Sequence, residues 1–202
     1  NVEKYGDTKM IDWPEYLIEA IARRKSVLFL GSGISANSCN AAGKHPLTWE
    51  AFLRDILEKR STKLARQKEV IEQMLSINDY LTACEIIVET LGDHDFGELA
   101  ANEFRRPGYK PSDIHEAVYR LDSRLVLTPN IDKIYEQYAM NASHSTVVAK
   151  SYYEDDIAKY LRTDDFLIIR VHGYVDDVSK IIFTHRQYSE ARCKYFIIYW
   201  ML

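Results

Sequence analysis

Apolar residues follow two kinds of pattern along this chain of 202 residues. In some stretches they recur every three or four positions, which predicts amphipathic helices. In others they form short continuous runs, which are typical of strands covered on both faces. Helices are predicted at residues 12–24, 48–59, 80–91, 112–121, 132–140 and 153–161, with Thr48 as a helix cap and one more helix after His185. Strands are predicted at residues 26–30, 124–127, 146–149, 166–171 and 180–183.

The order of these elements predicts the fold class. After residue 122 strands alternate with helices, which is typical of a mostly parallel sheet with helices on both faces. We therefore expect an α/β, Rossmann-like fold. Residues 36–122 have an almost entirely helical pattern and are expected to form an insertion within that fold. The length suits a single domain over residues 1–202.

Composition and charge narrow the class of ligand. The 26 basic and 30 acidic residues leave a net charge of −4, and both signs are mixed along the chain, so we expect no direct binding of nucleic acid. The longest apolar run, residues 195–202, is far shorter than the roughly 20 residues that span a membrane. The first residues do not resemble a secretion signal. We expect a cytoplasmic protein without membrane contact.

The cysteines and histidines give little sign of a metal site. Cys39, Cys84 and Cys193 form no CxxC pair, which predicts free thiols, and we expect them to be small buried residues. The acidic and histidine cluster at residues 93–95 is predicted to begin a helix, because adjacent helical residues do not face one way. His115 lies in an apolar helical pattern and is expected to be a hydrogen-bonded packing residue.

Three loops that follow predicted strands carry the candidate chemistry. The first reads Gly31-Ser32-Gly33-Ile34-Ser35-Ala36, the second Thr128-Pro129-Asn130-Ile131-Asp132, and the third His172-Gly173. Open α/β sheets bind ligands beyond the carboxyl ends of their strands, so we expect the three loops to lie together. The glycine turn could approach a diphosphate, and Gly173 permits an unusual backbone angle beside an imidazole. Taken alone, each loop also fits a structural role: a tight turn, a helix cap at Asp132, or a strand-end histidine.

In this order the motifs resemble the sirtuin fold: G-x-G-I-S, then T-x-N-I-D after a helical insertion, then an apolar strand that ends in H-G. The resemblance covers about residues 25–188. Protein-deacylating sirtuins carry two zinc-binding CxxC pairs shortly after the H-G, whereas residues 174–180 contain no cysteine. Without a zinc module, the chain resembles the sirtuin-like domains that hydrolyse NAD in bacterial anti-phage defence, as in Thoeris-type systems.

The sequence also departs from those domains. Their second motif is usually T-T-N-Y-D, whereas Pro129 replaces the middle Thr here, and Ile131 is nearer to the deacylases. Ser32 stands where the family usually has Ala. The later glycine-serine motif of the family has no match before Leu202. We therefore expect residues 1–202 to be a single sirtuin-like NAD-binding domain that lacks the C-terminal part of the nucleotide fold.

The resemblance implies an NAD glycohydrolase that releases nicotinamide and leaves ADP-ribose, with NAD as substrate and no metal. Asn130 would hold the attacking water, and His172 would act as general base, directly or through a ribose hydroxyl. Asp132 would hold the nicotinamide amide or orient Asn130. The residues implied in binding the dinucleotide are Gly31, Ser32, Gly33, Ile34, Ser35, Thr128, Asp132 and Gly173.

The same resemblance leaves other functions open. The leading hypothesis is an NAD-depleting effector of anti-phage defence. Because unrestrained NAD hydrolysis would harm the cell, we expect a homo-oligomer and a regulatory or sensor domain or subunit. An NAD-dependent protein deacylase would instead consume NAD only when an acyl-lysine peptide is present. A non-catalytic NAD-sensing or assembly module would bind NAD without forming product.

Overall fold

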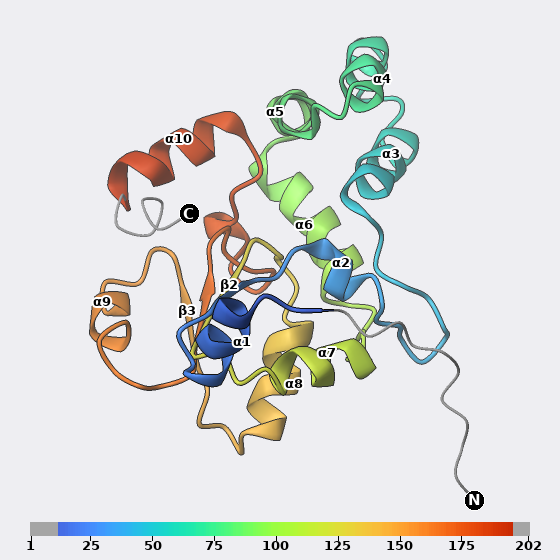
Figure 1. The fold of residues 1–202 in the computed structure, drawn as a ribbon. Coiled ribbons are helices and arrows are strands. Elements are labelled where there is room, and N and C mark those ends of the chain that lie inside the picture. The colour runs from blue at the N-terminus through green and yellow to red at the C-terminus, as the bar shows by residue number, and fades with distance from the viewer. Residues whose placement is uncertain (1–11, 196–202) are drawn as a thin grey trace, which may run out of the picture.

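A computed structural model describes residues 12–195 (Figure 1). Its centre is a four-stranded sheet in the order β1-β2-β4-β3, in which every neighbouring pair is parallel. The strands are β1 (Val27–Phe29), β2 (Leu125–Thr128), β3 (Val148–Ser151) and β4 (Leu167–Arg170). The expected α/β fold with a parallel sheet is therefore confirmed.

Helices cover both faces of the sheet, and alternate strand residues supply the two cores. Val126 and Ile168 point to one face, where they pack with Tyr135 and Ala139. Their neighbours in β2 and β4 point to the other face and pack with Ile157 and Ala191. The helices are α7 (Asp113–Tyr119) and α8 (Ile134–Ala142) on the first face, and α9 (Ile157–Tyr160) and α10 (His185–Lys194) on the second.

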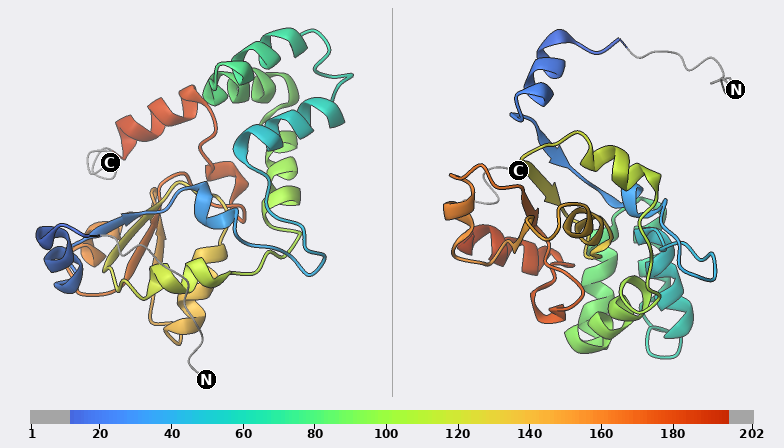
Figure 2. Two further views of the ribbon diagram at one scale, coloured as in Figure 1. Left: turned by 45° about the vertical axis from the view of Figure 1, so that its right-hand side comes forward. Right: turned by 90° about the horizontal axis from the view of Figure 1, so that it is seen from below.

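The chain between β1 and β2 is helical, and most of it forms a second body beside the sheet (Figure 2). We call α3 (Trp49–Lys59), α4 (Lys68–Ser76), α5 (Tyr80–Leu91) and α6 (Asp93–Phe104) the helical lobe. Thr48 caps α3 as predicted, since its hydroxyl accepts the backbone N–H of Ala51. The core of the lobe also takes in Ile131, Val175, Ile181 and Phe183. These four residues come from loops beyond the sheet, and they join the lobe to the carboxyl edge of the strands.

Two strand predictions need correction. β1 is not covered on both faces, because it lies at the edge of the sheet and its Val27 and Phe29 side chains are 54% and 59% exposed. The predicted strand at 180–183 is wrong as well. Residues Val178–Lys180 form a single 3₁₀ turn, and the next three residues join no strand. Those three residues are apolar because they are buried between the sheet and the helical lobe.

The first two helices and the cysteines agree only in part with the sequence predictions. α1 (Glu15–Ala22) lies within the predicted helix, and α2 (Ser32–Ser35) is a single turn. Of the three free cysteines, Cys84 is buried as expected. The expectation is wrong for Cys39 and Cys193, which are exposed and belong to none of the apolar cores. Among residues 12–195, no helix has the length and hydropathy to cross a bilayer. The apolar run at 195–202 falls, apart from its first residue, outside the described residues.

Candidate active site

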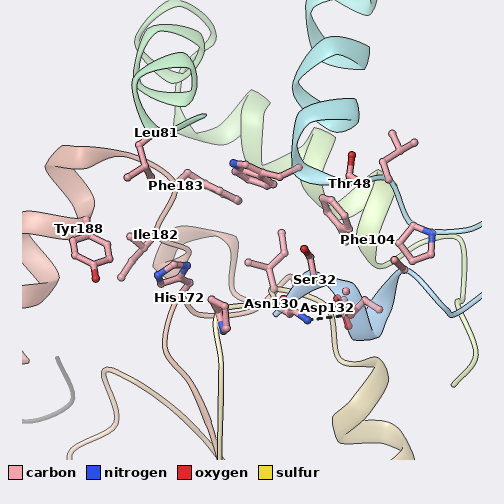
Figure 3. Close-up of a pocket in the computed structure, with 18 residues that line it drawn as sticks. Ser32, Thr48, Leu81, Phe104, Asn130, Asp132, His172, Ile182, Phe183 and Tyr188 are labelled. Carbon is pink, nitrogen blue, oxygen red and sulfur yellow. Dashed lines mark hydrogen bonds between the residues drawn. The ribbon is translucent and has the colours of Figure 1, made fainter. Parts of the chain in front are cut away.

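The three loops line one cavity of about 340 Å³ at the carboxyl edge of the sheet (Figure 3). The expectation that they lie together is therefore confirmed. The side chains of Asn130 and His172 lie on the sheet side of the cavity, and Leu81, Phe183 and Phe104 lie opposite, on the side of the helical lobe. The predicted site residues that line the cavity are Ser32, Gly33, Ser35, Asn130, Asp132 and His172.

A chain of hydrogen bonds joins the first two loops. The amide Nδ2 of Asn130 donates to the carbonyl of Gly31 at 2.9 Å and to Oγ of Ser35 at 3.1 Å. The Ser35 hydroxyl in turn donates to Oδ2 of Asp132 at 2.8 Å. Both amide hydrogens of Asn130 are thus taken up by the protein. Its Oδ1 has no partner among the described residues and is left as an acceptor for a ligand.

Asp132 supports this network from a half-buried position. Its Oδ1 accepts the backbone N–H of Ile134 at 3.0 Å, which holds the start of α8 as a short cap does. Burial raises the pKa of Asp132, and the hydrogen bonds from Ile134 and Ser35 act in the opposite direction. The carboxylate therefore orients Ser35, and through Ser35 it orients Asn130.

His172 follows β4 and presents its ring to the cavity without a hydrogen-bond partner among the described residues. Burial lowers the pKa of His172 to about 4, because the imidazolium would lose its hydration. The ring is therefore neutral at physiological pH, and one of its nitrogens carries a lone pair. A neutral imidazole at the wall of a cavity is suited to accept a proton from a bound water.

Four of the predicted binding residues do not line the cavity, and each has a structural role. The Thr128 hydroxyl donates to the carbonyl of Leu30 and accepts the N–H of Asn130, so it ties the ends of β1 and β2 together. Gly31 supplies its carbonyl to Asn130. Ile34 is buried in the core beneath α8, and Gly173 turns the chain after His172.

The glycines of the first and third loops differ in what they provide. Gly173 has a φ of +79°, and a Cβ there would lie 2.6 Å from the carbonyl oxygen of Lys180, so the unusual backbone angle is confirmed. Gly31 and Gly33 do not have positive φ angles. A Cβ on either would meet nothing within 4 Å. These two glycines leave open space in front of the backbone, which a ligand could occupy.

The lobe side of the cavity is apolar and aromatic. Trp49 stacks on Phe183 with ring centroids 5.6 Å apart and planes inclined by 10°. Leu81 and Phe104 come from α5 and α6, and Tyr188 comes from α10. The sequence places Trp49 in the predicted helix at 48–59 and Phe183 in the predicted strand at 180–183, and no pattern indicates a role for Tyr188. Their place in the cavity depends on how the lobe packs against the sheet.

The remaining histidine and acidic candidates are structural. His115 is fully buried, and its Nδ1 accepts the backbone N–H of Ser112 at 3.1 Å, which leaves Nε2 to donate to Ser38 at 3.5 Å. The cluster at 93–95 begins α6 as predicted. Within residues 12–195, no group of three or more His, Cys, Asp or Glu side chains is placed to hold a metal ion. Comparison with protein-family models and with curated proteins finds no match to this chain.

Proposed function

We propose that this protein hydrolyses the nicotinamide–ribose bond of NAD⁺. One observation carries the proposal: a carboxamide, a half-buried carboxylate and a neutral imidazole, drawn from distant parts of the chain, line one cavity beside a glycine turn. That position, beyond the carboxyl ends of parallel strands, is where open α/β sheets bind nucleotides. The sequence resemblance to sirtuin-like NAD hydrolases names the same residues.

The reaction can be divided among these groups. Water attacks C1′ of the ribose, the C–N bond breaks, and the pyridinium leaves with the bonding electrons as neutral nicotinamide. Oδ1 of Asn130 accepts one hydrogen of the water and so holds it in place. His172 accepts the other proton as the C–O bond forms, and this transfer is worth about 10²–10⁴-fold in rate. ADP-ribose is the second product.

The cavity suits the positive charge of the substrate. The nicotinamide ring of NAD⁺ is a cation, and positive charge moves onto the ribose as the bond breaks. Among the described residues, no Lys or Arg lines the cavity, whereas Asp132 and several aromatic rings do. Carboxylates and aromatic faces both stabilise cations in a site that excludes water. The first loop would then hold the diphosphate with the backbone beside Gly33.

The test is nicotinamide release from NAD⁺ by the purified protein, followed by chromatography. Asn130→Ala and His172→Ala should each lower the rate by about 10²-fold or more. Asn141→Ala and His94→Ala are matched controls, because both side chains are exposed and neither lines the cavity. Full activity in either cavity variant would contradict the proposal.

The same assay separates the other functions that the resemblance leaves open. NAD consumption only in the presence of an acyl-lysine peptide would identify a deacylase. Binding of NAD in calorimetry without any product would identify a sensing or assembly module. If hydrolysis is found, we propose that it serves to deplete NAD in anti-phage defence, under the control of a homo-oligomer and a regulatory domain or subunit.

A further inference from the structure

The imidazole of His172 is in contact with a ring that no sequence motif indicated. Tyr188 lies one turn into α10 and lines the same cavity. Its ring meets that of His172 nearly perpendicularly, with centroids 5.9 Å apart and planes inclined by 82°. Figure 3 shows the two side chains next to each other, with Tyr188 on α10 and His172 just after β4. Edge-to-face pairs of this kind favour one relative orientation of the two rings.

The position of Tyr188 is set by the way α10 begins. Thr184 caps the helix by accepting the N–H of Gln187 at 3.2 Å. The Gln187 side chain reaches back and accepts the N–H groups of Phe183 at 2.8 Å and Thr184 at 3.2 Å. This capping box fixes the first turn of α10 and therefore the direction of the residue that follows it.

The first turn of α10 is also tied to the helical lobe. Oε2 of Glu85 on α5 accepts the backbone N–H of Arg186 at 3.3 Å. Oδ1 of Asp93 on α6 accepts from the side-chain amide of Gln187 at 3.2 Å. The helix that carries Tyr188 thus connects the lobe with the end of β4, and the ring of Tyr188 moves with that connection.

Few other groups around the cavity could set the orientation or the pKa of the His172 ring. The titratable side chains that line the cavity within residues 12–195 are Asp132, His172 itself and Tyr188. Of the other elements around it, α3, α5, α6 and the segment after the 3₁₀ turn at Val178–Lys180 contribute Trp49, Leu81, Phe104, Ile182 and Phe183, which carry no charge. The low pKa of His172 has burial as its cause and no charged neighbour. Within the described residues, the His172 ring is held in place and shielded from water by packing, and not by an ion pair or a side-chain hydrogen bond.

We infer that Tyr188 is a positioning residue for His172: its ring keeps the imidazole turned toward the cavity and shields it from water. This inference rests on the proposed function, since it assigns a role relative to the general base. It also makes the helical lobe part of the catalytic arrangement. A displacement of α10 by the lobe would move the ring and expose the imidazole, which would then titrate nearer to 6.5.

The test compares Tyr188→Leu, which keeps apolar bulk but removes the ring, with Tyr188→Phe, which keeps the ring. Tyr16→Leu, at an exposed position of α1, is the matched control. An NMR titration of the His172 ring needs no substrate, so it reports on Tyr188 even if NAD is not the ligand. We expect the His172 pKa to rise by about one unit or more in Tyr188→Leu and to stay near the wild-type value in the other two variants.

Two further measurements make the outcome unambiguous. In the wild-type protein, nuclear Overhauser contacts should connect the two rings, and their absence would overturn the inference even if Tyr188→Leu fails to fold. In the activity assay, the acidic limb of kcat/KM for Tyr188→Leu should shift upward with the His172 pKa, and kcat at neutral pH should fall on the order of tenfold through loss of orientation. An unchanged pKa together with unchanged kcat in a folded Tyr188→Leu protein would refute it. Absence of nicotinamide release in every variant would refute the proposed function alone.

Discussion

Asn130 and Ser35, which lie 95 positions apart, are joined at 3.1 Å by a hydrogen bond from Nδ2 to Oγ. The direction of this bond is determined by its neighbours. Ser35 has a single hydroxyl hydrogen, which it gives to Asp132, so it can only accept from Asn130. The carbonyl of Gly31 is likewise only an acceptor. A flipped Asn130 amide would face two acceptors with its own oxygen, and the network therefore keeps Oδ1 available to a ligand.

Replacing Ser35 with Ala should disable the site without removing any group that touches the water. Asp132 would lose a hydrogen-bond donor in a half-buried position, which costs about 1–3 kcal/mol of stability. Asn130 would lose one of the bonds that set its orientation, and kcat should fall by about 10-fold or more. Denaturant unfolding and nicotinamide release measure the two effects.

Ser32→Ala is the control for this change. Ser32 lines the same cavity from the same turn, but its side chain is exposed and is not part of the network. Its stability should stay within about 0.5 kcal/mol of wild type. Equal stability losses in Ser35→Ala and Ser32→Ala would show that the network contributes nothing.

The pH dependence of activity should reflect the burial of His172. The base must be neutral, and its pKa is lowered to about 4. Activity should therefore be lost as pH falls through about 4 and not through 6.5. At pH 5.5 an ordinary histidine would be only about one-tenth neutral, whereas this one would be almost entirely neutral. A profile of kcat/KM from pH 3.5 to 8 decides between them, and a midpoint near 6.5 would contradict a buried base.

Gly33 and Gly173 should respond to the same substitution in opposite ways. Gly173→Ala places a Cβ against the Lys180 carbonyl at a positive φ and should destabilise the fold by about 2 kcal/mol or more. Gly33→Ala meets open space at an ordinary φ, so stability should be unchanged or slightly higher. Its methyl group takes space beside the cavity and should raise the KM for NAD⁺. Thermal unfolding with ligand titration separates the two, and an unchanged KM in a folded Gly33→Ala protein would remove the first loop from the binding site.

Local signals account for the elements that were predicted well. α5 has the predicted bounds, and α3 begins one residue after its predicted cap, because spacing and capping residues act within a few positions. The apolar run at residues 26–30 predicted the strand β1 but not its position at the edge of the sheet. Whether a strand is central or at an edge depends on which distant segments pair with it. Residues 181–183 are apolar and buried between the sheet and the helical lobe, and a short apolar run does not distinguish such a segment from a strand.

In the candidate site too, local signals predicted some features, and others depend on tertiary contacts. Its loops were predictable because each follows a strand, and parallel strands bring their carboxyl ends to one edge. The hydroxyl of Ser35 was not recognised as the link between loops, since the first loop suggested backbone contacts to a phosphate. The ring of Tyr188 reaches His172 only through the packing of α10 on the helical lobe. Tertiary contacts of this kind have no pattern in the sequence.

The strongest test of what holds the carboxyl edge together concerns Arg170 and Glu136. Arg170, the last residue of β4, donates from Nε and Nη2 to both carboxylate oxygens of Glu136 on α8, at 2.6 and 2.7 Å. Nη1 donates to Ser151 at 3.0 Å, and the guanidinium lies 4.3 Å from the ring centroid of Tyr174. Both charged groups are buried. Removing Arg170 would leave the buried Glu136 carboxylate with only the Lys133 ammonium, 3.9 Å away, and removing Glu136 would leave a buried guanidinium without a carboxylate.

Arg170→Met should therefore cost about 3–5 kcal/mol in urea unfolding, and the double variant with Glu136→Leu should recover part of that loss, because no buried carboxylate remains. Arg186→Ala is the matched control, since its ion pair with Glu190 is exposed and should be worth about 1 kcal/mol or less. A loss below about 1 kcal/mol in Arg170→Met would mean that the pair is not what clamps α8 to β4. Greater instability in the double variant than in the single one would mean that the buried carboxylate is satisfied by other groups.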